Sequence, residues 1–559
     1  MTADEPEPQS PRDNLGWATL ARLSRLIGLE KRILGILFSY AVAIGLFSLI
    51  VPLTVQELVN TFAFAIQPVM IVTLAGIMLA GLLFIGAFKV LQARGVETLQ
   101  QRIYTRVALA MTEHLPRLRE EAFLPRHVNH FIEAEFLTRA VVAMLIDAVN
   151  VLISGTIGMA ILVMYHPYFL GYNVLLISGF VFVATVFGQG GFRITQRMSR
   201  LNYEVFNWLQ DVGHNRLHFK ATESMPLLLK RTDELVRAYV KVRQTKSDIL
   251  TGRQYKSAVI WQAFGHSGMI GLGGWLLSVG NITLGQFVAA EVIVGTLILN
   301  LDTVARRMYA VFYIFTSLDE LATFFSLPKE MPFVQITASL PDPSIHGVRV
   351  TCKDVSFAYA NAPPVFEHFD LEIAPGEKVA VLSHTSIGKT TLALVLAGLY
   401  SPTFGVIRYN DVDLRDVDME YINRHRGLVL DSRVSLFEGT LEENISLHRP
   451  SIQFDDLRWA LRFVELEEEV DAMPQGFDTP VLARGKNFTN SQILRILLAR
   501  AIVIRPPLLV FDGTLHLIEP ELRTTLLRRL CAKEEPWSVI FVSSDPTIST
   551  LVDRRIVLD

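Results

Sequence analysis

Long stretches without a charged residue constrain this chain more than any other feature of its sequence. Four segments in the first 325 residues contain no Lys, Arg, Asp or Glu: 33–56, 58–88, 148–192 and 257–290. A helix needs about 20 mainly apolar residues to cross a bilayer, so each segment can hold at least one membrane span. The whole chain has 19% charged residues, against about 25% in ordinary soluble proteins. These figures argue against a wholly soluble protein and exclude a disordered chain.

Six membrane spans are predicted from these segments. The third segment is too long for one helix and is interrupted at His166-Pro167, so it is expected to form a hairpin of two spans. The fourth holds one span, then a turn at Gly280-Asn281 and the start of a sixth helix. The expected spans are 33–56, 58–88, 140–165, 168–188, 257–279 and from about 284 to beyond 300.

Basic residues predict the orientation of these spans. The long segments 89–139 and 190–256 are rich in Lys and Arg, whereas the short turns near 59–66, 166–167 and 280–283 contain none. Because loops on the cytoplasmic side carry the excess of Lys and Arg, both long segments and both termini are expected in the cytoplasm. Each long segment is expected to form a pair of helical extensions with a turn at its tip.

The N-terminus does not have the chemistry of a signal peptide. Residues 1–13 are polar and acidic, whereas a signal peptide has a basic start and an apolar centre. Residues 14–29 carry Trp17, Leu20, Leu23 and Ile27 among basic residues, a pattern that favours a short helix lying on the inner leaflet.

Four polar residues fall at or near membrane depth: Asp147, Asn150, Glu291 and Asp302. Charge inside a bilayer is costly, so such residues are candidates for contact with a transported substrate. Asp147 and Glu291 are the stronger candidates for a substrate path. The alternative for all four is an interhelical hydrogen bond or a position near a helix end.

The pattern changes at about residue 346, where short strands replace the long apolar helices. The strand 378–382 is followed by Ser383-His-Thr-Ser-Ile-Gly388-Lys389-Thr390-Thr391 and then by a helical run. In a loop of this kind the backbone amides hold the β-phosphate, the lysine neutralises phosphate charge and the hydroxyl binds Mg²⁺. Ser383 stands where the motif has its first glycine. The buried strand that ends at Asp512 would supply the acid that supports the Mg²⁺ water shell.

With these motifs the whole chain, over residues 15–559, resembles a half-transporter of the ABC exporter superfamily. Val355–Tyr359 is similar to the family's aromatic loop, Leu436–Ile445 to the segment that faces the coupling helices, and Leu497–Ala501 to the helix after the signature. The resemblance implies an all-α, six-helix transmembrane domain followed by an α/β P-loop NTPase-type cassette. The expected parts are a polar tail at 1–13, the transmembrane domain at 14–325, a linker at 326–345 and the cassette at 346–559.

The resemblance also implies ATP and Mg²⁺ as ligands and names the residues that hold them. Tyr359 is expected to stack on adenine, and Thr390 and Asp512 to hold Mg²⁺. The residues expected to bind the nucleotide are Tyr359, Ser383, Ser386, Gly388, Lys389, Thr390, Thr391 and Asp512, with Thr489 and Gln492 from the signature segment.

Several positions depart from the family pattern, and the departures have one direction. The glutamate that polarises the attacking water is Gly513, the switch histidine is Ser544, and the glutamine of the glutamine loop is Ser432, with Asp431 beside it. The signature segment is Phe488–Gln492, in which both glycines are replaced. Loss of a positioned general base alone costs about 10²–10⁴ in rate. The sequence therefore predicts a cassette that binds ATP but hydrolyses it very slowly or not at all, with no catalytic residue of the usual kind.

Three functions remain open for such a chain. It is predicted to be the inactive subunit of an export complex, paired with a second ABC half-transporter chain as a hetero- or homodimer. The alternatives are a pseudo-ATPase that serves as a membrane scaffold or nucleotide-sensing regulatory subunit, and a slow homodimeric exporter. The region around the first span resembles exporters of the type I secretion and peptide-exporting branch. That resemblance implies a bacterial inner membrane, a peptide or protein substrate and a periplasmic adaptor. The formal net charge of −3 gives no sign of a nucleic-acid partner.

Overall fold

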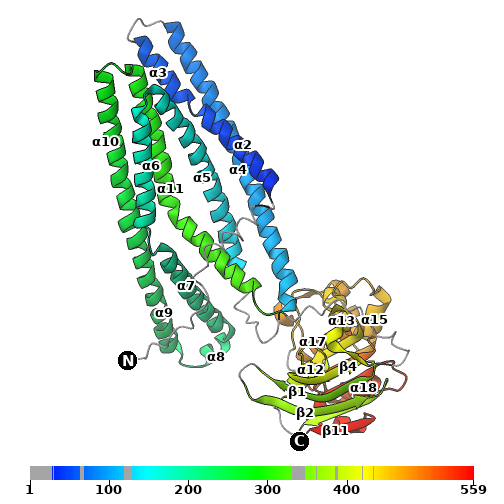
Figure 1. Cartoon of the computed structure of the whole chain (residues 1–559). Helices are drawn as coiled ribbons and strands as arrows, with labels where there is room; N and C mark the ends of the chain where they lie inside the picture. The colour runs from blue at the N-terminus through cyan, green and yellow to red at the C-terminus, as the bar shows by residue number, and fades with distance from the viewer. Residues whose placement is uncertain are drawn as a thin grey trace, which may run out of the picture. The chain divides into compact units, whose positions relative to one another are not determined.

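The computed structural model divides the chain into two compact units, Met1–Pro328 and Lys329–Asp559. Figure 1 shows a helical unit and a smaller unit that contains all the labelled strands. The structure describes residues 28, 30–62, 68–118, 129, 131–329, 347–359, 362–383, 388–417, 419–431 and 434–558.

The first unit consists of long helices that run side by side (Figure 1). Apolar residues dominate these helices. Their buried side chains form several small clusters rather than one wide core. One such cluster joins α5, α6, α10 and α11 around Leu162, Phe169 and Met269, all fully buried. The helices are α2 (Lys31–Phe47), α3 (Ile50–Phe62), α4 (Pro68–His114), α5 (Phe131–Tyr165), α6 (Tyr168–Val186), α7 (Gly191–His214), α8 (Arg216–Ala221), α9 (Met225–Ser247), the π-helix η3 (Asp248–Tyr255), α10 (Lys256–Ser278) and α11 (Leu284–Phe325).

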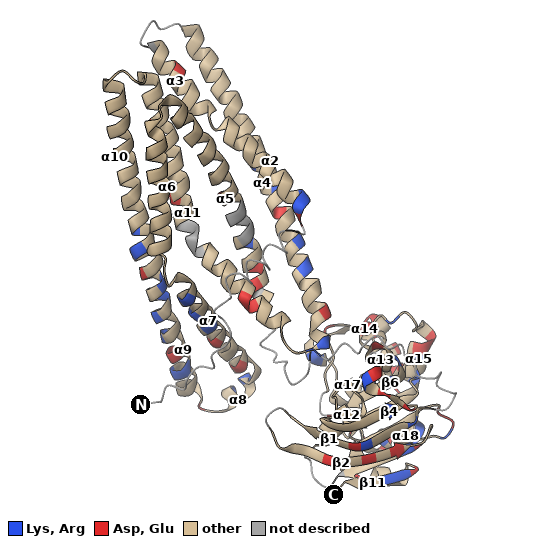
Figure 2. Ribbon diagram, viewed as in Figure 1, with Lys and Arg blue, Asp and Glu red and all other residues tan. Residues whose placement is uncertain are grey.

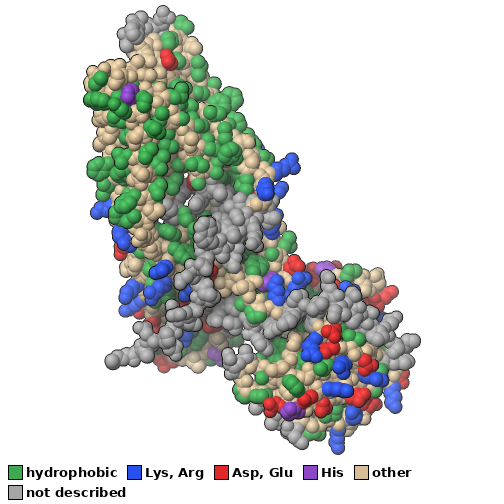
Figure 3. Space-filling model, viewed as in Figure 1, with side chains coloured by type: hydrophobic (Ala, Val, Ile, Leu, Met, Phe, Trp, Pro, Cys, Tyr) green, Lys and Arg blue, Asp and Glu red, His purple; other side chains and the backbone are tan. Residues whose placement is uncertain are grey.

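Within the described residues, five helical stretches are long and apolar enough to cross a membrane. They are Lys31–Thr61, Pro68–Arg117, Ile146–Tyr165, Tyr168–Val186 and Leu284–Phe325. The predicted span at 257–279, the fifth in chain order, lies in α10. This segment is helical but is not among the five, because its glycines and polar side chains lower its hydropathy. Membrane integration is therefore supported, and the number six stays a prediction. Figure 3 shows hydrophobic side chains spread over the outside of this unit, as expected for helices whose surroundings are lipid.

The chain breaks where the sequence indicates. His166-Pro167 separates α5 from α6, because proline cannot continue the helix that precedes it. Gly280 has φ +78°, a left-handed conformation that favours glycine, and it forms the turn between α10 and α11. Thr283 then starts α11 through a capping box with Gln286.

Both long basic segments are helical in their described parts. In the first, α4 continues to His114 and α5 begins at Phe131. In the second, α7, the short α8 and α9 follow one another, and Figure 2 shows Lys and Arg along α7 and α9. The short helix predicted at 14–29 falls outside the described residues except for residue 28.

The second unit contains two main sheets. One is antiparallel, with strand order β2-β1-β4-β5, and the other is parallel, with order β11-β3-β10-β9-β6. The strands are β1 (Val350–Ala358), β2 (Pro364–Ile373), β3 (Lys378–Ser383), β4 (Phe404–Tyr409), β5 (Val412–Asp413), β6 (Arg426–Leu430), β9 (Leu508–Asp512), β10 (Ser538–Ser543) and β11 (Arg554–Leu558), besides the short pair β7 (Gly439–Thr440) and β8 (Pro480–Val481).

Helices cover the parallel sheet, so its central strands are continuous apolar runs. Every residue of β9 and of β10 is buried, as expected for a parallel sheet with both faces covered. The helices are α12 (Lys389–Leu396), α13 (Met419–His425), α14 (Leu441–Ser446), α15 (Phe454–Phe463), α16 (Glu467–Asp471), α17 (Asn490–Ile502) and α18 (Pro520–Leu530). The fold predicted from sequence, an α-helical membrane-type part followed by an α/β cassette, is confirmed.

The parallel sheet also determines where a ligand can bind. Leu430, Ser383, Asp512 and Ser543 end the neighbouring strands β6, β3, β9 and β10. In open α/β sheets, ligands bind beyond the carboxyl ends of the strands. The loops that follow these four residues therefore form the candidate site.

Candidate nucleotide site

Gly388, Lys389 and Thr390 lie at the start of α12, directly after the loop that follows β3. Gly388 has φ +89°, and a Cβ atom there would lie 2.8 Å from Val365 Cγ1, so a side chain at this position would strain the backbone and displace Val365. The amides at the start of a helix point outward and attract anions. Ser383 ends β3, and Ser386 lies outside the described residues. The described part of the loop therefore has the form expected of a phosphate site.

Thr390 and Asp512, 122 positions apart in sequence, meet in the structure. Thr390 Oγ1 donates a hydrogen bond to Asp512 Oδ2 over 2.7 Å. Asp512 is 6% exposed and ends β9, between β6 and β10. A hydroxyl and a carboxylate are the hard oxygen ligands that Mg²⁺ prefers, usually alongside substrate phosphates and water. The pair predicted to hold the metal is therefore brought together with chemistry that fits it.

Tyr359 lies beside α12. Its hydroxyl shares a hydrogen bond of 2.8 Å with Thr391 Oγ1, and its ring meets Phe357 and Tyr400 edge to face. Tyr359 is 36% exposed, which leaves it accessible to a stacking base. The side chain of Thr391 is buried and directed at Tyr359, so it supports the aromatic residue.

Thr489 and Gln492 of the signature segment form the N-terminal cap of α17. Thr489 Oγ1 accepts a bond from the Gln492 amide (3.2 Å), and Gln492 Oε1 accepts one from the Thr489 amide (2.9 Å). Gln492 Nε2 also donates to Glu469 over 2.8 Å. Both side chains thus satisfy helix-end amides. Their role toward nucleotide stays a prediction.

Gly513 is surrounded by residues that sequence reasoning did not assign to the site. A Cβ atom at this position would meet Asp431 Oδ2 and lie 2.7 Å from Asp431 Cγ. Asp431 Oδ2 in turn pairs with His516 Nδ1 over 2.9 Å. Burial raises the pKa of the Asp431 carboxyl, and its contacts with His516 partly oppose that rise. A carboxylate and an imidazole therefore occupy the surroundings of the missing glutamate.

Of the two other departures, one lies at the same edge of the sheet. Ser544 directly follows β10 and is exposed. Ser432 lies outside the described residues. No group of three or more His, Cys, Asp or Glu side chains that could hold a metal ion occurs among the residues that the structure describes.

The polar residues of the helical unit differ in their partners. His266 Nδ1 lies 3.2 Å from Glu291 Oε1, and Glu291 Oε2 is buried without a hydrogen-bond partner among the described residues. Asp302 accepts from Gln262 over 3.2 Å. Asp147 is half-buried in α5 and has an interaction partner. Two polar pairs thus join α10 to α11, and the substrate roles of Glu291 and Asp147 stay predictions.

Asn150 has the interhelical hydrogen bonds offered as the alternative to a substrate role. Its amide and that of Gln92 on α4 exchange two bonds of 3.0 and 3.1 Å. The reciprocal geometry satisfies both side chains, so the pair joins α4 to α5 and leaves little for a ligand.

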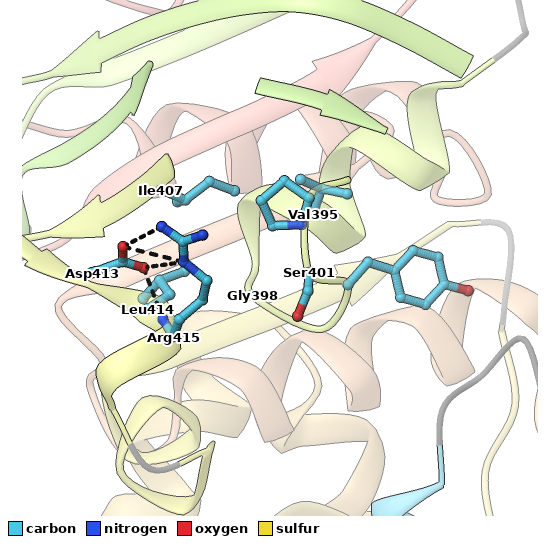
Figure 4. A pocket seen from close by; sticks show the side chains of 9 residues that line it. Val395, Gly398, Ser401, Ile407, Asp413, Leu414 and Arg415 are labelled. Carbon is cyan, nitrogen blue, oxygen red and sulfur yellow. Dashed lines mark hydrogen bonds and ion pairs between the residues drawn. The ribbon is translucent and has the colours of Figure 1, made fainter. Parts of the chain in front are cut away.

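One surface pocket of the cassette lies apart from the predicted nucleotide residues. Figure 4 shows the Arg415 guanidinium turned toward Asp413, to which it donates bonds of 2.7 to 3.2 Å. The lining residues are Val395, Gly398, Tyr400, Ser401, Pro402, Ile407, Asp413, Leu414 and Arg415. None of them belongs to the predicted nucleotide set, so the pocket is not assigned to ATP.

Comparison with known proteins supports this interpretation of the cassette. Residues 366–516 match the ABC transporter family. A multidrug efflux ATP-binding/permease protein of Mycobacterium bovis is 29% identical over 304 residues, which cover 53% of this chain and 24% of that protein. A fatty acid ABC transporter ATP-binding/permease protein of the same species is 27% identical over 354 residues (61% and 54%). A leukotoxin translocation ATP-binding protein of Mannheimia glucosida is 26% identical over 289 residues (52% and 40%).

The matched region thus spans about a quarter to about half of the length of these relatives. A solved structure of a bacterial Atm1-family ABC exporter with ATP bound superposes with a TM-score of 0.83 at 20% identity and covers 95% of this chain and 94% of that one. At this identity the likeness concerns the fold. The chain thus contains a region, residues 366–516, that matches the ABC transporter family, and as a whole it has the fold of an ABC exporter.

Proposed function

We propose that this chain, with its cassette and exporter-type membrane domain, is a half-transporter subunit that binds MgATP but hydrolyses it very slowly or not at all. The observation that carries the proposal is the bond between Thr390 and Asp512, next to Gly513. The site keeps the groups that hold a nucleotide and its metal. The position that should supply the base has no side chain.

The nucleotide-holding half of the proposal is supported by local geometry. Lys389 and Thr390 stand at the start of α12, where helix amides favour phosphate. Tyr359 is partly exposed and contacts α12 through the hydrogen bond between its hydroxyl and Thr391. Mg²⁺ bound by Thr390 and Asp512 would neutralise phosphate charge. These residues account for binding without a hydrolytic step.

The hydrolytic deficiency is supported by three independent features. Gly513 cannot accept a proton from water, and loss of a general base costs about 10²–10⁴ in rate. Ser544 replaces an imidazole at the end of β10. The signature side chains Thr489 and Gln492 are occupied in a helix cap. Loss of preorganised donors at the γ-phosphate would slow the reaction further.

A second ABC half-transporter chain is the partner proposed for this subunit, because exporters of this fold form dimers. We place the spans in a bacterial inner membrane with the termini and the cassette in the cytoplasm. The names of the relatives refer to multidrug efflux, fatty acid transport and leukotoxin translocation. For this chain we retain a peptide or protein substrate, contacted by Glu291 and Asp147, and a periplasmic adaptor as proposals.

Nucleotide binding by the full-length chain in lipid nanodiscs tests the first half of the proposal. A fluorescent ATP analogue should bind in the presence of Mg²⁺. Lys389→Ala should weaken binding by at least about tenfold, because it removes the cation at the phosphates. Lys533→Ala removes an exposed lysine elsewhere in the cassette and should leave binding unchanged. Equal binding by wild type and Lys389→Ala would contradict the assignment of this loop.

Capture of the tagged chain from its native membrane tests the second half. Co-purification of another cassette-bearing membrane chain supports the role of inactive subunit. A pure homodimer whose transport collapses with Lys389→Ala would favour the slow autonomous exporter. A homodimer that binds ATP and associates with an unrelated complex would favour the scaffold or regulatory subunit.

A further inference from the structure

Asp431 lies in the volume that a side chain at position 513 would need. The residue follows β6, and the strand β6 pairs with β9 directly before Gly513. A Cβ atom on residue 513 would meet Asp431 Oδ2 and lie 2.7 Å from its Cγ and 2.9 Å from its Cβ. Contacts between carbon atoms are favourable at about 3.5–4.0 Å. Even an alanine at 513 would therefore displace Asp431.

Asp431 is held in this place by the segment that contains Gly513. Its amide donates to the Asp512 carbonyl over 3.1 Å. Its Oδ2 accepts from the His516 amide over 3.2 Å and pairs with His516 Nδ1 over 2.9 Å. Asp431 is 7% exposed, so it has little room to move outward. These three contacts close a small ring of residues around Gly513.

The backbone at Gly513 adds a second, independent obstacle to a side chain. Its φ is +122°, in a region that residues with a Cβ rarely adopt. The Gly513 amide donates to the Val542 carbonyl over 2.9 Å, so this conformation is tied to the neighbouring strand β10. A residue other than glycine must therefore change the backbone as well as move Asp431.

Charge makes the obstacle larger for a glutamate than for an alanine. Two carboxylates that share a buried site cannot both remain ionised without strong repulsion. His516 already pairs with Asp431, so a second carboxylate would lack an imidazole partner. The space next to Gly513 admits one acidic side chain, and Asp431 supplies it.

We infer that Asp431 and Gly513 form one coupled determinant of this site: Asp431 has taken the place of the residue-513 side chain, so a glutamate restored at 513 alone does not fit. The functional meaning rests on the proposed deficiency in hydrolysis, whereas the coupling rests on the geometry alone. The deficiency is thus built into two positions, 82 residues apart in sequence, rather than into one substitution.

The thermal unfolding midpoint of the full-length protein in detergent tests the coupling. Gly513→Ala should lower the midpoint of the cassette by about 4–10 °C, because it combines overpacking with backbone strain. In the Asp431→Gly background, which removes all three close atoms, the same change should lower it by less than half as much. The matched control is Asp416→Gly, at an exposed site in the cassette, in which Gly513→Ala should keep its full effect.

Additive effects of Asp431→Gly and Gly513→Ala would overturn the inference, since independent sites show no coupling. If Gly513→Ala does not fold, recovery of the protein from the membrane replaces the midpoint. Recovery of the double variant alone supports the inference, and failure of both to fold contradicts it.

ATP turnover separates this inference from the proposed function. Gly513→Glu alone should leave turnover within about threefold of wild type. A rise of tenfold or more, with an unchanged midpoint, would show that the carboxylate fits and would overturn the inference. Fast turnover by the wild type would instead contradict the proposed deficiency and leave the measured coupling between positions 431 and 513 intact.

Discussion

Asn444 offers the sharpest test of how the cassette holds its segment 436–445. The residue lies in α14 and is fully buried. Its Nδ2 donates to the Phe437 and Thr440 carbonyls over 2.9 and 3.0 Å, and its Oδ1 accepts from the Phe437 amide over 3.2 Å. Arg500 of α17 donates to the same Oδ1 over 2.9 Å. One side chain thus joins the segment to the helix that follows the signature.

The magnitude follows from these four bonds. A neutral hydrogen bond contributes about 0.5–1.5 kcal/mol net and one to a charged group about 1.5–3 kcal/mol, with a further penalty for partners left buried and unpaired. Arg500 is largely shielded from water: its burial, and then the neighbouring charge of Arg449, lower its pKa to about 10. Without Asn444 its guanidinium would therefore lose a partner that water cannot readily replace. Asn444→Ala is therefore expected to cost about 3–5 kcal/mol, at the high end for single substitutions.

Thermal unfolding of the full-length protein in detergent, followed by tryptophan fluorescence, measures this cost. The buried Trp537 reports on the cassette. For a unit of this size, about 3–5 kcal/mol corresponds to a fall of about 8–15 °C. Asn487→Ala is the matched control, because Asn487 is exposed and makes two hydrogen bonds, to Pro480 and Leu482. A midpoint for Asn444→Ala within about 2 °C of wild type would refute the network argument.

Three other expectations concern stability and reactivity. Glu133, 8% exposed, accepts from Tyr203 over 2.8 Å and from a hydroxyl on α11, so Glu133→Ala should lower the midpoint by several degrees in the same assay. Burial raises the pKa of both Cys352 and Cys531 to about 12, so a maleimide at about pH 7.5 should label neither in the folded chain and both after denaturation, as counted by mass spectrometry. Burial lowers the pKa of Lys378 from 10.5, so the unfolded chain binds more protons between the folded pKa and 10.5 and stability should rise with pH there. Lys378→Met should lack that rise in thermal midpoint; an equal rise in both proteins would contradict it.

Local patterns predicted much of the fold because their causes are local. Pro167 ends a helix through its own ring, and uncharged runs favour helices wherever lipid surrounds them. Gly388 and Lys389 were identifiable because a phosphate loop places its residues within a few positions of one another. The Thr489–Gln492 capping box also had a sequence signal, a threonine followed three residues later by glutamine. Because these residues also resemble the signature segment, the sequence favours a nucleotide-binding role for them instead.

Other features depend on contacts that no short pattern contains. Asp431 and His516 are 85 positions apart, and their pairing follows from the order of β6 and β9 in the sheet. The partners Glu291 and His266 are placed by the packing of α10 on α11. Sequence indicated that residue 513 lacks a carboxylate. The structure adds that another carboxylate stands next to it.

The chemical state of nucleotide bound to the purified full-length protein tests the central claim most directly. Protein in nanodiscs is incubated with radiolabelled ATP and Mg²⁺, freed of unbound nucleotide, and sampled over an hour by thin-layer chromatography. The structure predicts that nucleotide remains bound and remains ATP, because Thr390 and Asp512 can hold it with Mg²⁺ and Gly513 provides no base. Bound nucleotide that converts to ADP within seconds, with steady turnover of about 1 s⁻¹ or faster, would contradict that claim.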